Sequence, residues 1–521
     1  MLRRNIGRRM DRRVFLAASA SSLLVASRGW SSDEVVRKNL SLGANPFTLG
    51  VASGDPTATG LVIWTRLAPK PTEGGGMPSD AVAVRWEVAD DESFKKIVRQ
   101  GEGVASPTLA HSVHIEVEGL QPNRWYFYRF AVGSDVSPVG RARTMPADGS
   151  SPERLRFAFA SCQHWEAGYF TAYEHMAKSD LDLIFHLGDY IYEGPGRKGV
   201  RTHTGSTEIK TLLDYRNRHA QYKTDSFLQS VHAKCPWMVT WDDHEVDNNY
   251  AGEISEEENV DPRDFLVRRA AAYQAYYEHM PLRHDTIPSG PGMKLYRRVR
   301  FGNLAEFSLL DTRQYRSDQP FGDGLKPLNK STIDPMATML GSDQERWLFA
   351  GLEVSQCRWN VLAQQVMMAH VDFSPGKGEA FSMDQWPGYS VARRRVLEFI
   401  AQKQIANPIV LTGDIHSNWC NDLLVDFDDK EAKPVASEFV GTSITSGGDG
   451  GKLKFPEKMI LDQNPFVKFQ NSKRGYVECT VTPKQWRSDY QMVDFVTKPG
   501  APLKTIASFV VEAGTAGVNR A

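Results

Sequence analysis

The chain has 521 residues, more than a single hydrophobic core usually serves, so we expect two domains of unequal size. Hydrophobic residues make up 41% and charged residues 24%, which is ordinary for a globular protein and excludes a fibrous or disordered chain. The formal net charge of -1 argues against nonspecific nucleic-acid binding, which needs a basic face to displace counterions from phosphates.

The N-terminus predicts export. Arg12 and Arg13 precede Phe15, and a short apolar run then ends near Ala26. The run is too short to span a bilayer and has the order of a signal peptide. Two adjacent arginines before Phe-Leu are similar to the twin-arginine signal, which exports folded proteins. We therefore expect a twin-arginine signal peptide at residues 1–27, the twin-arginine export machinery as a partner, a periplasmic or secreted protein, and no stable membrane insertion after cleavage.

Residues 42–147 show the alternation of half-buried strands. Apolar side chains take every second position from Val82 to Val88, from Val113 to Val117 and from Tyr126 to Val132. Turn-forming clusters separate these runs. Short alternating strands over about 100 residues predict a small β-sandwich, similar to immunoglobulin-like or fibronectin-like domains.

Residues 153–500 follow a different pattern, in which continuous apolar runs replace alternation. Helical stretches such as 170–178 and 391–401 separate several of the runs, which favours an α/β domain with strands covered on both faces. The runs are Phe157–Ala160, Leu183–Leu187, Met238–Trp241, Phe307–Leu310, Val361–Val366 and Ile409–Thr412.

Polar clusters stand directly after five of these strands. In open α/β sheets, ligands bind at the carboxyl ends of the strands, so the clusters are expected to meet. An Asp after a single strand is often only a helix N-cap, but so many carboxylates at one edge require cations. The clusters predict a metal site; they are Ser161-Cys162, Gly188-Asp189-Tyr190, Asp242-Asp243-His244-Glu245, Asp311-Thr312-Arg313 and Gly413-Asp414-Ile415-His416.

These motifs, in this order, resemble the calcineurin-like metallophosphoesterases, and most closely the alkaline phosphatase D (PhoD-like) family. The resemblance extends over nearly the whole chain. It implies a four-layer α/β/β/α metallophosphoesterase domain preceded by the β-sandwich. The matching segments are 159–163, 186–193, 240–250, 310–316 and 413–416.

The resemblance also implies a ligand set. Asp189 would bridge two metals, and Cys162, Tyr192 and His416 would complete the first site. Asp243 and Asp414 would serve the second site. Many members of the wider superfamily have Asp or His, Asn and His where this chain has Cys162, Asp243 and Asp414.

Ligand chemistry indicates which metals would fit. A thiolate and a phenolate, from Cys162 and Tyr192, favour Fe(III), whereas the carboxylates of Asp189, Asp243 and Asp414 suit Ca²⁺ or another hard divalent ion. The resemblance implies the same pairing. A zinc site is a weaker interpretation, because it would favour more His or Cys.

The expected reaction is hydrolysis of phosphate mono- and diesters by metal-activated water or hydroxide. His244 is a candidate to stabilise the transition state or protonate the leaving oxygen, and Arg313 to hold phosphate oxygens. Otherwise His244 caps a helix and Arg313 pairs with Asp311. Asn248 and Asn249 are candidates for substrate or calcium binding, although a turn explains them almost as well.

Two alternative functions are weighed against this one. The first is an exported binding module that keeps metals only for stability. The second is a phospholipase-type phosphodiesterase, which comparison of lipid and soluble diesters would distinguish.

Overall fold

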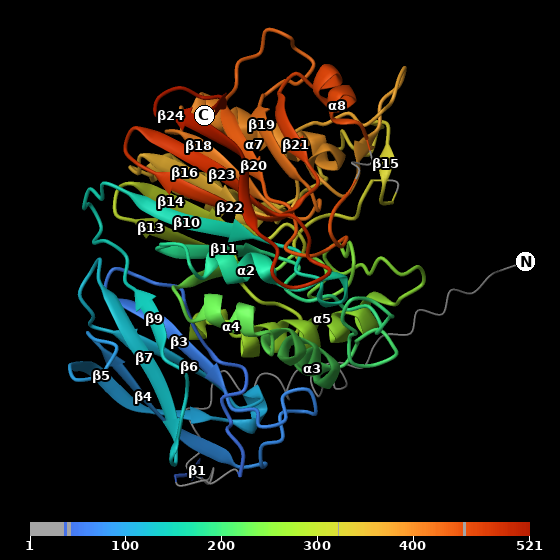
Figure 1. The fold of residues 1–521 in the computed structure, drawn as a ribbon. Helices are drawn as coiled ribbons and strands as arrows, with labels where there is room; N and C mark the ends of the chain where they lie inside the picture. Colours follow the sequence, from blue (N-terminus) through green and yellow to red (C-terminus); the bar gives the residue numbers. More distant parts are fainter. Residues whose placement is uncertain (1–35, 39–42, 321, 452–454) are drawn as a thin grey trace, which may run out of the picture.

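The computed structural model describes residues 36–38, 43–320, 322–451 and 455–521 (Figure 1). The predicted signal peptide at residues 1–27 lies outside the described residues. Among the helices of the described segments, none combines the length and the apolar character needed to cross a membrane.

The N-terminal region is β-rich, as predicted. In β7 every second side chain is buried, and the Tyr126 hydroxyl accepts a hydrogen bond from the backbone N–H of Gln121 at 2.9 Å, the corner arrangement of immunoglobulin-like domains. Within the described residues one sheet contains β1 (Val36–Arg37), β4 (Ala81–Ala89), β5 (Ile97–Ala105), β7 (Trp125–Val132), β8 (Asp135–Val136) and β9 (Gly140–Arg143).

The facing N-terminal strands belong to a larger sheet that continues into the α/β region. The junction is the pairing of Gly54 with Trp237, which joins β2 to β12. Over the described ranges the order in this sheet is β25 (Asn519–Arg520), β24 (Leu503–Glu512), β23 (Gln485–Val493), β22 (Arg474–Val481), β10 (Leu155–Ala160), β11 (Leu183–Leu187), β12 (Trp237–Thr240), β2 (Val51–Gly54), β3 (Gly60–Arg66) and β6 (Ser112–Glu118).

A second large sheet packs face to face against the first. Buried side chains from both sheets, among them Phe157, Phe307 and Trp486, form the core between them. Its order is β13 (Arg297–Phe301), β14 (Ala305–Leu309), β16 (Trp359–Ala363), β18 (Pro408–Thr412), β20 (Ala436–Val440), β19 (Asn418–Leu423) and β21 (Val467–Asn471); β15 (Leu325–Lys326) and β17 (Phe381–Ser382) pair separately.

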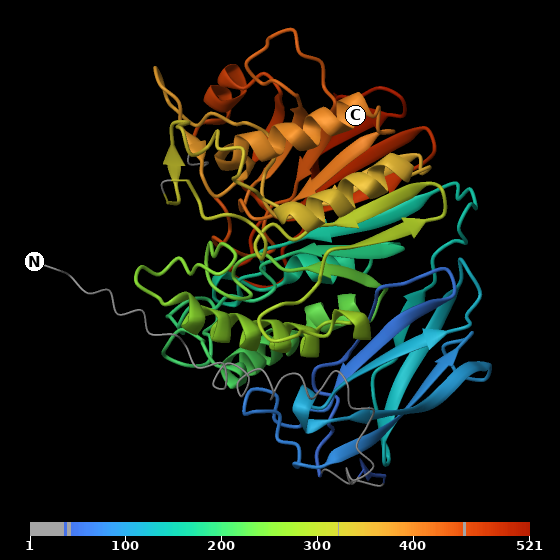
Figure 2. The same ribbon diagram turned by 180° about the vertical axis from the view of Figure 1, so that it is seen from behind.

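Helices cover the outer faces of both sheets, and Figure 2 shows α6 and α7 lying across the second one. The result is the predicted four-layer α/β/β/α arrangement. The helices of the described residues are α2 (Thr171–Met176), α3 (Leu212–Lys223), α4 (Ser226–His232), α5 (Pro262–His279), α6 (Gly341–Val354), α7 (Ser390–Gln402) and α8 (Glu457–Gln463), with short 3₁₀ turns η1 (Pro107–Leu109), η2 (Trp165–Ala167), η3 (His284–Thr286) and η4 (Trp386–Tyr389).

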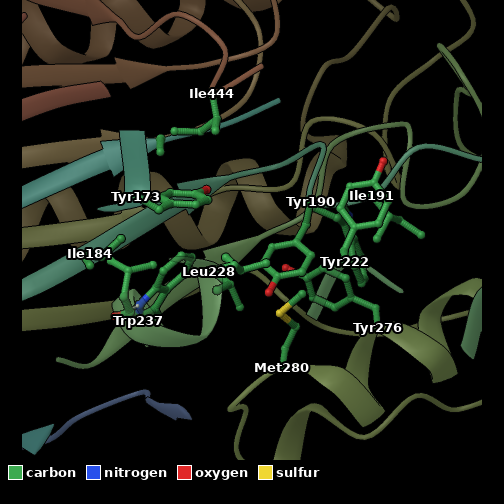
Figure 3. Packing of buried hydrophobic residues seen from close by; sticks show 14 of the residues in the cluster. Tyr173, Ile184, Tyr190, Ile191, Tyr222, Leu228, Trp237, Tyr276, Met280 and Ile444 are labelled. Carbon is green, nitrogen blue, oxygen red and sulfur yellow. Dashed lines mark hydrogen bonds between the residues drawn. The ribbon is translucent and has the colours of Figure 1, made fainter. Parts of the chain in front are cut away.

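The segment after β11 is anchored by its apolar members. Tyr190 and Ile191 are at most 1% exposed and pack among Tyr222, Leu228 and Tyr276 (Figure 3). Burying side chains of this size stabilises the fold by about 1.5–3 kcal/mol each. This anchoring holds the flanking residues Asp189 and Tyr192 in place at the sheet edge.

Lys223 at the end of α3 is an unusual member of this core. Its side chain is buried with the ammonium 4.4 Å from the ring centroid of Trp64, and burial lowers its pKa from 10.5 to about 7. At pH values between about 7 and 10.5, Lys223 is protonated in the unfolded chain but neutral in the folded protein. Lys223 therefore destabilises the fold most at and below pH 7. The free energy of unfolding rises as the pH increases from about 7 toward 10.5.

We expect the substitution Lys223→Met to raise the free energy of unfolding at pH 7. Between pH 7 and 9 the wild-type value should rise more steeply than that of the variant, by about 1.4 kcal/mol per pH unit. Urea unfolding at several pH values measures the difference. Parallel pH dependences of the two proteins would contradict this account of Lys223.

Candidate metal centre

The predicted site residues stand in loops where the backbone is forced into the left-handed region. Cys162 follows β10, Asp189 follows β11, and Asp414 and His416 follow β18, with φ of 59°, 56°, 61° and 55°. This conformation is costly for residues other than glycine and is concentrated at functional sites. The turns direct four potential ligands to one edge of the paired sheets.

The first group of side chains gathers around Asp189. Ligand atoms of Cys162, Asp189 and His416 lie within 4.8 Å of one another. The Tyr192 hydroxyl donates to Asp189 Oδ2 at 2.8 Å and lies 3.1 Å from His416 Nε2. The structure thus brings together all four residues predicted for the first metal.

The second group shares Asp189 and adds carboxylates from the loop after β12. Ligand atoms of Asp189, Asp243 and His244 lie within 4.8 Å of one another, as do those of Asp242, Asp243 and Asp414. Asp243 and Asp414, predicted for the second metal, are therefore neighbours. Asp189 lies between the two groups, the position that a bridging ligand requires.

The donor set fits metal ions. Asp189 Oδ1 and Asp243 Oδ1 are buried, and neither has a hydrogen-bond partner among the described residues; Asp243 Oδ1 has the Arg313 guanidinium at the longer ion-pair distance of 3.7 Å. An orphaned buried carboxylate oxygen is costly unless a cation neutralises it. These two oxygens therefore support cations between the carboxylates.

The protonation of the site is set by burial and by negative charge. Burial and the neighbouring Asp189 raise the pKa values of the Cys162 thiol and the Tyr192 hydroxyl well above their usual range. Burial, opposed by Arg313 and reinforced by Asp384, raises the pKa of Asp414 to about 7. Because metal ligands must be deprotonated, metal binding here would release protons.

Arg313 lies beneath the second group and is fully buried. Its guanidinium donates to Asp242, to both oxygens of Asp384 at 2.9 and 3.0 Å and to Asp414 at 3.2 Å. Each of its three nitrogen atoms thus points at a carboxylate. This geometry favours a role in neutralising and positioning carboxylates over the predicted contact with substrate, which stays a prediction.

His244 packs against Tyr192, with ring centroids 4.1 Å apart, and its Nδ1 lies 2.7 Å from Glu193 Oε2. Burial alone would lower the pKa of His244, but Glu193, Asp189 and Asp243 raise it well above its usual value. A cationic imidazole held beside the carboxylates is a reasonable proton donor. The predicted catalytic role of His244 stays a prediction.

The two asparagines are oriented by other contacts. The Asn248 amide donates to Glu256 at 2.5 Å, and the Asn249 amide donates to Asp323 at 2.5 Å. The Asn249 backbone N–H donates to Asp243 Oδ2 at 2.7 Å, so this residue orients a predicted ligand through its main chain. The substrate-binding role predicted for both side chains remains a prediction.

Two buried residues outside the predicted ligand set, Glu245 and Gln365, tie the strand ends together. The carboxylate of Glu245 accepts the backbone N–H groups of Tyr190 at 2.5 Å, Asp242 at 2.9 Å and Asp189 at 3.1 Å. The Gln365 amide donates to Thr240 and Leu310, both at 2.9 Å. In the sequence Glu245 belongs to one of the five polar clusters, and Gln365 is marked by its place near the end of the Val361–Val366 run.

Gln385, in the loop before η4, was not predicted from the sequence. Its amide donates to Asp414 Oδ2 at 3.1 Å, whereas its carbonyl oxygen is buried without a partner among the described residues. No periodic pattern marks this loop in the sequence. Gln385 therefore connects a predicted metal ligand with the space beside it.

Comparison with known proteins identifies the family of the chain. The family model for the PhoD-like phosphatase matches residues 157–490, and that for the PhoD-like phosphatase N-terminal domain matches residues 32–146. Alkaline phosphatase D of Bacillus subtilis (strain 168) is 55% identical over 482 residues, which is 91% of this chain and 82% of that protein.

Solved structures give the same result. The structure of PhoD superposes with a TM-score of 0.90 at 54% identity, covering 93% of each chain. Purple acid phosphatase PPD1 from yellow lupin (Lupinus luteus) shares the fold, with a TM-score of 0.53 at 11% identity, covering 89% of this chain and 74% of that one. The chain therefore belongs to the PhoD-like phosphatases, a family of metal-dependent phosphoric ester hydrolases.

Proposed function

We propose that this phosphatase works with a mixed iron and calcium centre on phosphate mono- and diesters. The observation that carries the proposal is the position of Asp189, whose carboxylate belongs to both ligand groups. Cys162, Tyr192 and His416 would hold Fe³⁺ with Asp189, because thiolate and phenolate favour a ferric ion. Asp243 and Asp414 would hold Ca²⁺, which prefers hard oxygen donors.

The metals would supply Lewis acidity, which lowers the pKa of water and offsets negative charge on the phosphate. The chain would supply the proton for the departing alcohol. His244 Nδ1 donates to Glu193, so the opposite ring nitrogen, Nε2, is free to deliver a proton to the leaving oxygen. Burial would raise the pKa of Glu193, but His244 lowers it below its usual value, so Glu193 stays ionised and fixes this orientation.

Turnover with defined substrates tests the activity. We expect chelator-sensitive hydrolysis of p-nitrophenyl phosphate and bis-p-nitrophenyl phosphate, restored by iron and calcium together. Metal-loaded protein that hydrolyses neither would support the binding module instead. Faster hydrolysis of a phospholipid than of either soluble ester would support the phospholipase-type alternative.

The iron assignment has a spectroscopic test. A tyrosinate on Fe³⁺ gives a visible charge-transfer band, and we expect Tyr192→Phe to abolish it while iron content falls only in part. Tyr190→Phe is a matched control, because Tyr190 packs in the core. A colourless, active protein loaded with zinc would refute the iron assignment.

We propose that the protein acts in the periplasm or outside the cell after twin-arginine export, on the basis of Arg12 and Arg13. We expect Arg12→Lys combined with Arg13→Lys to retain the protein in the cytoplasm. Fractionation with a signal-specific antibody measures this. Unchanged export of the double variant would contradict the proposed route.

A further inference from the structure

Two residues of the first ligand group, Cys162 and Tyr192, would bind a metal as thiolate and phenolate. Together with the carboxylate of Asp189 they would place three anionic donors on one ion. Strongly donating ligands lower the Lewis acidity and the reduction potential of a metal, and hydrogen bonds to the ligand atoms oppose this effect. The groups that surround the sulfur of Cys162 and the phenolic oxygen of Tyr192 therefore influence what the ion can do.

A buried serine lies against each of these two ligand atoms. Ser446 Oγ lies 2.6 Å from the hydroxyl oxygen of Tyr192, and Ser161 Oγ lies 3.2 Å from Cys162 Sγ. Both serines are 1% exposed. Water therefore has little access to either contact.

The two serines come from different sheets. Ser161 follows β10 of the first sheet, and Ser446 lies in the loop after β20 of the second sheet. A parallel bridge between Ser161 and Ser443 joins the two chain segments, and the backbone N–H of Ile444 donates to the Ser161 carbonyl at 3.0 Å. The contact between the sheets thus fixes both serines relative to the ligands.

The proton of the Ser446 hydroxyl has two acceptors within reach. One is the oxygen of Tyr192, and the other is the backbone carbonyl of Cys162 at 2.8 Å. This carbonyl also accepts the backbone N–H of Ser446 at 3.2 Å, so it keeps a partner without the hydroxyl. An ionised oxygen is the stronger acceptor, and hydroxyl donors approach it to about 2.5–2.7 Å. Ser446 therefore donates to Tyr192 once the phenol has lost its proton.

The same reasoning gives the direction of the second hydrogen bond. A thiolate has no proton to donate, so the hydroxyl of Ser161 is the donor when Cys162 is ionised. The ring of Tyr192 is also held in place, because it packs against His164 and His244 with ring centroids 4.4 and 4.1 Å away. Its oxygen is thereby kept next to Ser446.

We propose that Ser446 and Ser161 are positioning residues that donate hydrogen bonds to the ionised Tyr192 and Cys162 and thereby raise the Lewis acidity and the reduction potential of the iron. This inference rests on the proposed function and deepens it. Each hydrogen bond withdraws electron density from its ligand atom, so the ligand donates less to the metal. The two serines thus offset the strong donation that distinguishes a thiolate and phenolate site.

Ser446→Ala in the metal-loaded protein tests the contact with Tyr192. We expect the visible tyrosinate band to move to longer wavelength, because the electrons of the phenolate are no longer stabilised by a hydrogen bond. The equilibrium between ferric and ferrous iron should shift about tenfold toward ferric iron, which is about 59 mV for one electron. Absorption spectroscopy and redox titration measure the two effects, and resonance Raman scattering from tyrosinate assigns the band. Ser446→Thr keeps a hydroxyl and should restore both values.

Ser161→Ala tests the contact with Cys162 separately. It should shift the iron equilibrium in the same direction but should not move the tyrosinate band to longer wavelength, because it acts through the thiolate. Ser443→Ala is the matched control. Ser443 is buried in the same loop as Ser446, and its hydroxyl donates to the Ser446 carbonyl at 2.7 Å rather than to a ligand. This control should change neither the band nor the equilibrium.

A double variant separates the hydrogen bond from packing of the loop. In the Tyr192→Phe background, Ser446→Ala should have no further effect on the iron equilibrium, because its acceptor is gone. Equal shifts in both backgrounds, or the same shift in Ser443→Ala, would overturn the inference, as would an unmoved band in Ser446→Ala. Wild-type protein that binds iron without a tyrosinate band would refute the proposed iron site itself, and the inference with it.

Discussion

Asp189→Asn is expected to remove both metals and to lower kcat/KM by at least about a thousandfold. The carboxylate of Asp189 belongs to both ligand groups, and its Oδ1 is buried without a partner among the described atoms. An amide has no charge with which to bind two cations, so the remaining carboxylates would lose most of their compensation. Metal analysis after dialysis and turnover of bis-p-nitrophenyl phosphate measure the two effects.

His244→Ala is the control for this experiment, because His244 is proposed to move a proton rather than to hold a metal. It should keep both metals and slow turnover by a factor of about 10² to 10⁴. Loss of metal in His244→Ala would instead make His244 a ligand, which its place in the group with Asp189 and Asp243 permits. Retention of both metals in Asp189→Asn would refute the role of Asp189 as a ligand shared by the two metals.

Much of this site could be predicted from the sequence because its ligands follow strands that are buried on both faces. Continuous apolar runs such as Leu183–Leu187 mark such strands, and parallel strands bring their carboxyl ends to one edge. The sequence therefore predicts that Asp189, after that run, and Asp414, after Thr412, lie at the same sheet edge. The layered α/β fold then suffices to predict that the two ligand groups lie next to each other.

Other features depend on contacts between distant parts of the chain and could not be predicted in this way. The junction of β2 with β12 pairs Gly54 with Trp237, and nothing in either short strand specifies that partner. Asp384 and Gln385 come from a stretch with little regular structure, so no periodicity marks them. The deep burial of Arg313 follows from packing of the second sheet against the first, which a pattern in one strand does not report.

Arg313→Met is expected to destabilise the protein strongly, with a loss of about 3–5 kcal/mol in the free energy of unfolding. The guanidinium is fully buried and donates to Asp242, Asp384 and Asp414, so its removal leaves several buried carboxylates without a cation. A methionine fills similar volume but supplies neither charge nor hydrogen bonds. Urea unfolding of the metal-loaded protein measures the loss.

Arg316→Met is the matched control, since Arg316 pairs with Asp384 at 2.7 Å and Asp384 would retain Arg313. We expect a smaller loss of stability in this variant. Arg313→Lys should recover only part of the lost stability. A single ammonium group cannot donate to three carboxylates in the planar arrangement of the guanidinium. Unchanged stability in Arg313→Met, together with a large rise in KM, would instead support direct phosphate binding by Arg313, the role that its place at a strand end first indicated.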